Sequence, residues 1–343
     1  MTIKDLAAIT GYAVGTVSRA LNDHPNVSDK ARKAILQAAK EYGFQLNTNA
    51  KQLKQASSNT ILAIVKGTGN EFFKEMLEYL QPLIAKTRYQ LVVDYLDEDR
   101  NEVIRAVQLC REKKPLGILF LGGNAKNFAA DFDKIDIPCV EVTNDASTLP
   151  FSNLSSVTTD DREAARCAID TLVAAGHRKI AIIGGDRNTS DISRLRYEGC
   201  LQSFEEHGIP FDPQKDYHGV RFSCEDGYKA TQKLLNNGSA YTAIFAISDV
   251  MAIGAIRALW EAGKKVPEDV SIIGLDGLAL GKYLVPQLST VQQDFRTIVL
   301  RSVKILLSAI EDGTPAKHET VPFQVQCRES IRSLRIQRRD NHA

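Results

Sequence analysis

The side chains with the clearest chemical potential lie near the start of the chain, on the outer face of one short predicted helix. In the run from Thr16 to Asn22, Val17 and Leu21 are four residues apart, so both point inward. The opposite face carries small or hydrogen-bonding groups, namely Val14, Gly15, Ser18, Arg19 and Asn22. An arginine can form two hydrogen bonds with one guanine edge, and small neighbours allow close approach to a duplex. The pattern is typical of a helix that reads DNA bases.

Two further predicted helices position this face. Thr2 can cap a first helix with Asp5 over its positive end, Leu6 and Ile9 form its inner face, and Gly11 permits a left-handed turn. Ser28 caps a third helix, from Asp29 to about Tyr42, whose supporting residues are Ala31, Ile35, Leu36 and Ala39. Helices this short are not stable alone, so their proximity predicts a packed helix-turn-helix. The alternative is an ordinary helical bundle with Arg19 as a solvated charge, but such a bundle needs no Thr-Val-Ser-Arg helix beside a tight glycine turn.

The segments "TIKDLA", "TVSRALN" and "NVSDKARKAILQAAKEYGF" resemble the N-terminal signature of the LacI/GalR family of bacterial transcriptional regulators. The resemblance implies that Val14 and Gly15 enter the major groove and that Arg19 contacts a base. It also implies phosphate contacts for Thr16, Ser18, Asn22 and Ser28. Two positions depart from the family pattern: Ala13 replaces a capping Ser or Thr, and Leu46 replaces a proline. The first departure should weaken the cap of the recognition helix.

A short polar segment, residues 47–59, follows the third helix and ends in a serine-rich linker. Alone it should be disordered or barely helical. The family resemblance makes it a hinge helix, with Leu53 as a wedge between base pairs in the minor groove when two copies pair. An ordinary flexible linker, with Leu53 packed on its own domain, is the alternative.

Charge and composition separate this N-terminal piece from the rest of the chain. The 343 residues carry a formal charge of +1, yet the first 58 contain eight basic and four acidic residues. Such an asymmetry favours a nucleic-acid-binding module on a neutral body. The six cysteines are scattered without metal-ligand spacing, so no metal site is expected, and they suit a reducing cytoplasm. With neither a leader nor an apolar run of roughly 20 residues, we expect no membrane contact and a cytoplasmic, nucleoid-associated protein.

From Thr60 onward, short apolar runs alternate with amphipathic helices, which predicts two successive doubly wound α/β lobes. The expected domains are 1–46 for DNA binding, 47–59 for the hinge and 60–343 for ligand binding and dimerisation. By resemblance to the family, the first lobe comprises about 60–157 and 289–319, the second about 158–288 and 320–335, with three crossings between them. The predicted strands are 61–65, 91–93, 117–121, 139–142, 179–184, 243–247 and 270–274, with later strands starting at Thr290 and Val321. Ligands of such folds bind between the lobes, at the carboxyl ends of the strands.

The motifs "LVAAGHRKIAIIGG", "RLRYEGC", "SIIGLDG" and "PQLSTVQQD" resemble the family's effector domain, which is similar to periplasmic sugar-binding proteins. By that resemblance the effector residues are Phe72, Phe73, Arg196, Phe222, Ser248, Asp249 and Asp276. Arginine and aspartate together offer donors and acceptors to adjacent hydroxyls, which suits a polyol. Alternatives remain for several of these residues. Arg196 and Asp276 could pair only with each other, Phe72 or Phe73 could belong to the core, and Asp249 could cap its helix. Arg221, beside Phe222, could favour an anionic ligand, but an exposed loop charge is the commoner explanation.

Three classes of function fit two α/β lobes. The favoured one is a homodimeric transcriptional regulator, most often a repressor in this family, that binds a near-palindromic operator and responds to a small polar effector such as a sugar. A solute-binding protein of a sugar transport system is the alternative, disfavoured by residues 1–55. An enzyme is not expected, because the sequence contains no GxxxxGK[ST], no GxGxxG after the first strand, no GxSxG and no HExxH. We therefore expect no catalytic residue and no cofactor.

Overall fold

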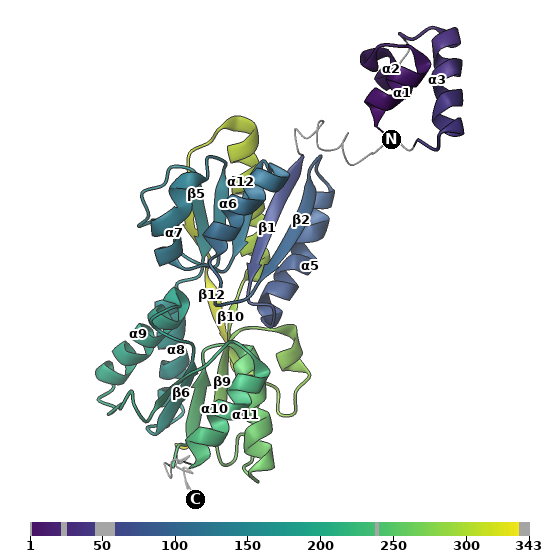
Figure 1. Cartoon of the computed structure of the whole chain (residues 1–343). Coiled ribbons are helices and arrows are strands. Elements are labelled where there is room, and N and C mark those ends of the chain that lie inside the picture. Colours follow the sequence, from purple (N-terminus) through teal and green to yellow (C-terminus); the bar gives the residue numbers. More distant parts are fainter. Residues whose placement is uncertain (1, 22–25, 45–58, 237–239, 336–343) are drawn as a thin grey trace, which may run out of the picture. The chain divides into compact units, whose positions relative to one another are not determined.

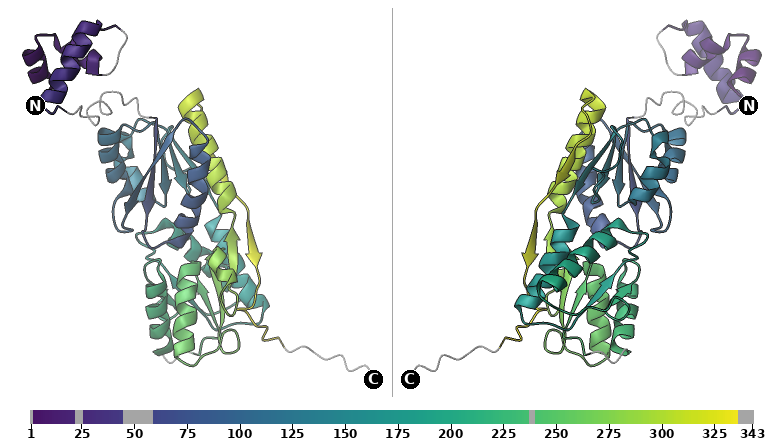
Figure 2. Two further views of the ribbon diagram at one scale, coloured as in Figure 1. Left: turned by 90° about the vertical axis from the view of Figure 1, so that its right-hand side faces the viewer. Right: turned by 90° about the vertical axis from the view of Figure 1, so that its left-hand side faces the viewer.

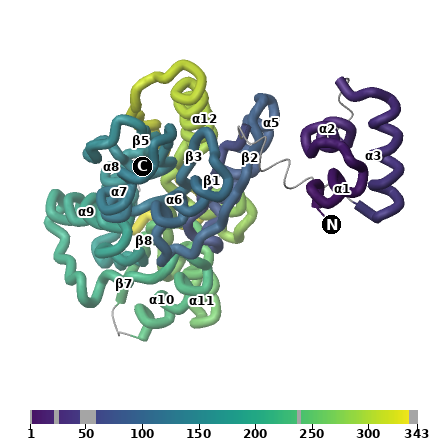
Figure 3. The backbone as a smooth tube through the Cα atoms, turned by 45° about the horizontal axis from the view of Figure 1, so that its top comes forward, coloured from purple at the N-terminus to yellow at the C-terminus, as the bar shows by residue number. Residues whose placement is uncertain are grey.

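The computed structural model describes residues 2–21, 26–44, 59–236 and 240–335, in two compact units, 1–57 and 58–343. In the first unit, helices α1 (Ile3–Thr10), α2 (Val14–Leu21) and α3 (Asp29–Glu41) pack closely together (Figure 3). Their shared core is built on Leu6, Val17 and Ile35, none of which is exposed. Burial against neighbours supplies the stability that helices of this length lack alone.

The predicted caps of this unit are confirmed. The Asp5 carboxylate accepts from the Thr2 N–H at 2.7 Å, and the Asp5 N–H donates to the Thr2 hydroxyl at 3.3 Å. These hydrogen bonds lower the pKa of Asp5. Gly11 ends α1 at a φ of 71°, and the Ser28 hydroxyl accepts from the Ala31 N–H at 3.4 Å.

Two residues predicted to be buried are exposed: Ile9 is 46% exposed and Leu36 is 47% exposed. The inward stripe of α1 runs instead through Leu6 and Ala7, and that of α3 through Ala31, Ile35, Ala38 and Ala39. Successive residues of a helix are rotated by about 100°, so Ile9 and Leu36 point away from these stripes although they are close to them in sequence.

The second unit contains two α/β lobes, one above the other in Figure 1. The first lobe has a parallel sheet in the order β11-β5-β4-β3-β1-β2. Its strands are β1 (Thr60–Lys66), β2 (Gln90–Leu96), β3 (Gly117–Leu121), β4 (Cys139–Val142), β5 (Leu154–Thr158) and β11 (His318–Thr320). Its helices are α5 (Glu71–Ala85), α6 (Glu102–Lys113), α7 (Ala125–Asp131), the 3-10 turn η1 (Phe132–Lys134) and α12 (Phe295–Asp312). Alternate residues of β1 enter two separate cores, with Ile61 in one and Leu62 in the other, so both faces of the sheet are covered.

The second lobe has a sheet in the order β12-β10-β9-β8-β6-β7, parallel except for β12. Its strands are β6 (Ile180–Gly184), β7 (Tyr217–Gly219), β8 (Ala243–Ala246), β9 (Ser271–Asp276), β10 (Ser289–Gln293) and β12 (Phe323–Gln326). Its helices are α8 (Asp161–Ala174), α9 (Asp191–Glu206), α10 (Cys224–Asn236), α11 (Asp249–Glu261) and the turn η2 (Ala279–Lys282). The predicted fold class, a helical unit followed by two doubly wound lobes, is confirmed. Over the described ranges, the chain has no helix with the length and apolar character to span a bilayer.

The chain crosses between the lobes three times: from β5 to α8, from β10 to α12 and from β11 to β12. In Figure 2 the yellow C-terminal segments pass along both lobes. The number of crossings is as predicted, but the start of the first lobe's return at residue 289 is wrong. Ser289–Gln293 hydrogen-bonds to β9 on one side and β12 on the other, so this strand belongs to the second sheet. The return begins with α12, which contacts β3, β4 and β5.

The missing cap of α2 gives a testable prediction. The Ala13 carbonyl accepts from the N–H groups of Thr16 and Val17 at 2.8 and 3.0 Å, so Ala13 occupies the cap position without a side-chain oxygen. Ala13→Ser should raise the free energy of unfolding of the three-helix unit by about 1 kcal/mol. The exposed mid-helix change Ala8→Ser should lower it by roughly 0.5 kcal/mol. Hydrogen exchange of the α2 amides measures both, and equal effects of the two substitutions would contradict the capping argument.

Candidate functional site

The outer face of α2 remains open in the first unit. Val14 is 42% exposed, Gly15 and Arg19 are exposed, and Thr16 and Ser18 are half-buried. Ser28 is exposed and serves as the cap of α3. The other two residues predicted to contact DNA, Asn22 and Leu53, lie outside the described residues. The face therefore presents one arginine among small side chains, a surface shaped for close approach to base edges.

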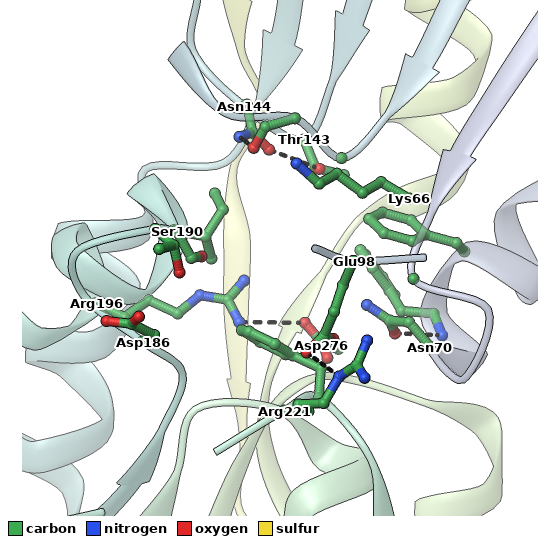
Figure 4. Close-up of a pocket in the computed structure, with 18 of the residues that line it drawn as sticks. Lys66, Asn70, Glu98, Thr143, Asn144, Asp186, Ser190, Arg196, Arg221 and Asp276 are labelled. Atoms are coloured by element: carbon green, nitrogen blue, oxygen red, sulfur yellow. Dashed lines mark hydrogen bonds and ion pairs between the residues drawn. The ribbon is translucent and has the colours of Figure 1, made fainter. Parts of the chain in front are cut away.

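A cavity of about 370 Å³ lies between the two lobes of the second unit, large enough for a small organic ligand (Figure 4). The first lobe contributes the polar side chains of Lys66, Asn70, Glu98, Asp99, Thr143 and Asn144. The second contributes those of Asp186, Ser190, Arg196, Arg221, Asp276 and Gln293. In Figure 4 the labelled side chains of Lys66, Thr143 and Asn144 lie across the cavity from those of Arg196, Arg221 and Asp276.

Arg196, on α9, is the charged centre of the cavity floor and is only 4% exposed. Its Nε donates to the Asp161 carboxylate at 2.7 Å, and one Nη donates to the carbonyl of Ile247. The same Nη lies 3.6 Å from a carboxylate oxygen of Asp276. Arg196 is thus not paired with Asp276 alone. It joins α8, the end of β8 and the end of β9 at one point of the cavity wall.

Asp276 ends β9 in a conformation that non-glycine residues rarely adopt, with a φ of 126°. Its carboxylate accepts from the Ser248 hydroxyl at 2.9 Å and from the Gln293 amide at 3.0 Å. Burial raises its pKa to about 6, although Arg196 opposes that shift. Backbone strain maintained by surrounding hydrogen bonds is a feature of ligand sites.

Ser248 and Asp249 are fully buried and are not among the residues that line the cavity. The Asp249 carboxylate accepts from the N–H groups of Gly277 and Leu278 at 2.9 and 2.7 Å, and from the Thr290 hydroxyl at 2.7 Å. It therefore holds the loop after β9 and does not cap its own helix. Burial and the neighbouring charge of Asp276 raise the pKa of Asp249 to about 7. Ser248 thus holds the Asp276 carboxylate and Asp249 holds the backbone that follows it, which differs from the direct ligand contact expected of both residues.

The three predicted aromatic residues all line the cavity, but they differ in burial. Phe72 and Phe73 are 4% and 8% exposed, and Phe72 packs edge-to-face on Phe295, so both also belong to the core of the first lobe. Phe222 is half-buried and packs against Gly185, where an added Cβ would lie 2.8 Å from its ring. Each offers an apolar face to a ligand.

None of the polar side chains that the first lobe contributes to the cavity was predicted from the sequence. Lys66 ends β1, Glu98 follows β2, and Thr143 and Asn144 follow β4. Asp186 follows β6 in the second lobe. The general rule that ligands meet the carboxyl ends of parallel strands would have identified them.

Arg221 has a different role from the exposed loop charge considered above. Its guanidinium crosses the cleft and forms ion pairs with Glu98 at 2.6 Å and Asp97 at 2.7 Å. The lobes are thus connected at the cavity mouth by a second-lobe cation and first-lobe carboxylates. We call this group the mouth clasp.

The buried Asp249 gives a prediction for stability against pH. Its pKa in the folded state lies above the ordinary value of 3.8. Between about pH 4 and pH 7, the folded state therefore keeps a proton that the unfolded state has already released. This contribution is complete below about pH 4 and is lost as the pH rises to about 7. Asp249→Asn removes the titration, so the variant should gain melting temperature relative to the wild type between pH 5 and pH 8. Asp312→Asn, at an exposed position, is the control, and a difference that does not change with pH would refute the argument.

Two family models match separate parts of the chain. Residues 2–47 match the family of bacterial regulatory proteins of the lacI type, and residues 143–331 match a periplasmic binding protein-like domain. The HTH-type transcriptional regulator MalR of Clostridium butyricum is 32% identical, covering 96% of this chain and 99% of the relative.

Two solved structures share the fold. The lac repressor dimer bound to operator and the anti-inducer ONPF has a TM-score of 0.70 and 24% identity, covering 97% of this chain and 99% of that one. A LacI family transcriptional regulator from Enterococcus faecium with bound ribose also has a TM-score of 0.70, with 25% identity, covering 80% of this chain and 100% of that one. The two family models and the full-length similarity to MalR agree with the exposed outer face of α2 and the cavity between two lobes. The chain therefore belongs to the LacI family of bacterial DNA-binding transcriptional regulators.

Proposed function

We propose that this LacI-family regulator is a homodimer that represses transcription from a near-palindromic operator and that a small polar effector, a sugar or sugar derivative, controls its affinity for DNA. The observation that carries the proposal is the cavity between the lobes, with Arg196 and Asp276 in its wall. Two lobes joined by three short crossings can rotate toward each other about those segments. A ligand held by both lobes favours the closed arrangement.

The DNA side of the proposal rests on α2, with Val14, Gly15 and Arg19 as the groups that meet base edges. Thr16, Ser18, Asn22 and Ser28 are assigned to phosphate contacts. Leu53, outside the described residues, is assigned to the minor groove. Since the target is chromosomal DNA, we infer that the protein acts at the nucleoid.

The effector side rests on the polar cavity and on what relatives bind. The Enterococcus faecium protein carries ribose, and the lac repressor is a dimer on its operator. A free transport protein is not favoured, because the family match includes the recognition helix.

The role of Arg19 can be tested by separating its charge from its hydrogen-bonding fork. Arg19→Ala should weaken operator binding by about 1–3 kcal/mol per half-site and relax base preference at the position that it reads. Arg19→Lys keeps the charge but loses the fork, so it should retain more of the salt dependence while losing base preference. Binding curves on variant operators at two salt concentrations measure both effects. Unchanged base preference in both variants would remove Arg19 from the interface.

The effector site can be tested at Asp276, where asparagine preserves the shape of the side chain. A sugar identified by thermal-shift screening of the full chain should change operator affinity in the wild type. A tenfold change corresponds to about 1.4 kcal/mol of coupling. Asp276→Asn should abolish that response while operator affinity without the sugar stays nearly normal. Arg196→Ala should do the same, at a cost in stability because it leaves Asp161 buried without its partner. A full response in Asp276→Asn would move the effector site elsewhere.

A further inference from the structure

We infer that the cleft selects an effector without negative charge, an uncharged polyhydroxy compound, and excludes phosphorylated and acidic sugars. This inference rests on the proposed effector site and specifies its ligand. The structural basis is that each cationic side chain among the described residues of the cavity wall is already paired with a carboxylate of the protein.

The three cationic side chains lie at different depths in the cavity, but each is paired with a carboxylate. Lys66 Nζ lies 2.6 Å from Glu102, a carboxylate with no exposed surface. At the floor, Arg196 is bound to Asp161 at 2.7 Å. At the mouth, Arg221 is bound to Glu98 and Asp97 at 2.6 and 2.7 Å, with Asp99 at 3.7 Å. An anionic ligand would have to compete with these carboxylates for each cation.

Carboxylates also outnumber cations in the wall itself. Those that line the cavity are Glu98, Asp99, Asp186 and Asp276, and the further carboxylates Asp97, Glu102 and Asp161 pair with the cations. A phosphate or carboxylate placed among them would experience net repulsion, strengthened where the wall excludes water. The remaining lining suits hydroxyl groups, because Asn70, Thr143, Asn144 and Ser190 offer neutral polar groups beside Phe72 and Phe222. Hydroxyls both donate and accept, so they can satisfy carboxylates and amides alike.

Glu98 is the residue that sets this selectivity at the mouth. It lines the cavity and holds the Nε of Arg221, so its charge neutralises the cation nearest to solvent (Figure 4). Replacing it by glutamine removes one negative charge from the cavity and loosens the mouth clasp. The Nε of Arg221 is then available to an anionic group of a ligand, while Asp97 still holds one Nη.

The experiment compares matched neutral and acidic sugars on the full-length protein by calorimetric titration at constant ionic strength. The probes are ribose with ribose 5-phosphate, glucose with glucuronate and glucose 6-phosphate, and galactose with galacturonate. In the wild type a neutral sugar should bind at least tenfold more tightly than its acidic counterparts. Glu98→Gln should reduce that ratio at least threefold. Glu319→Gln, which breaks the Arg301–Glu319 surface pair at 3.1 Å, is the matched control and should leave the ratio unchanged.

The outcomes separate this inference from the proposed function. An acidic or phosphorylated sugar that binds as tightly as its neutral parent, or more tightly, and changes operator affinity would overturn the charge selection while the regulator function stands. A ratio that Glu98→Gln and Glu319→Gln change equally would overturn the assignment of selectivity to Glu98. If no neutral or acidic member of the set binds, the sugar effector itself is rejected, and the inference is rejected with it.

Discussion

The buried charge of Arg196 is the constraint on which the cavity between the lobes depends. A guanidinium that is 4% exposed needs nearby carboxylates and acceptors, because an uncompensated charge in the interior is strongly destabilising. Asp161, Asp276 and the carbonyl of Ile247 supply them from three different elements. Asp276 in turn needs Ser248, Gln293 and a strained backbone to reach its place. One side chain therefore fixes how α8, α9 and the ends of β8 and β9 meet.

The fold was predictable from the sequence wherever burial on both faces of a strand leaves a continuous apolar run. The strands around Ile61, Ile118 and Ile182 were found for that reason. The polar strand Leu154–Thr158 and the three-residue strands β7 and β11 give no such signal and were missed. The lobe assignment of Ser289–Gln293 was wrong because it depends on hydrogen-bond partners distant in sequence, which periodicity does not reveal.

For the candidate site, the sequence predicted which residues lie near the cavity better than it predicted which of them are exposed to it. Arg196, Phe222 and Asp276 were assigned by motif, and all three line the cavity. Ser248 and Asp249 come shortly after β8, where ligand-binding residues are expected. The loop after β9 covers them, and this packing between distant parts of the chain is not visible in the sequence. Arg221 could not be assigned from its neighbours in sequence, because its partners Asp97 and Glu98 are more than 120 residues away.

The contacts that connect the lobes explain why a small ligand can control the arrangement. The mouth clasp is a group of largely exposed ion pairs, which contribute little to stability and weaken with salt. Other connections include hydrogen bonds such as Ala125 N–H to Asp191 at 2.8 Å and Ala279 N–H to Glu75 at 3.0 Å. Each is worth about 0.5–1.5 kcal/mol, which is comparable to the coupling needed for a tenfold change in DNA affinity. In the proposed mechanism the few hydrogen bonds of one effector molecule act against terms of this size, because a ligand acts only through its differential affinity for the two states.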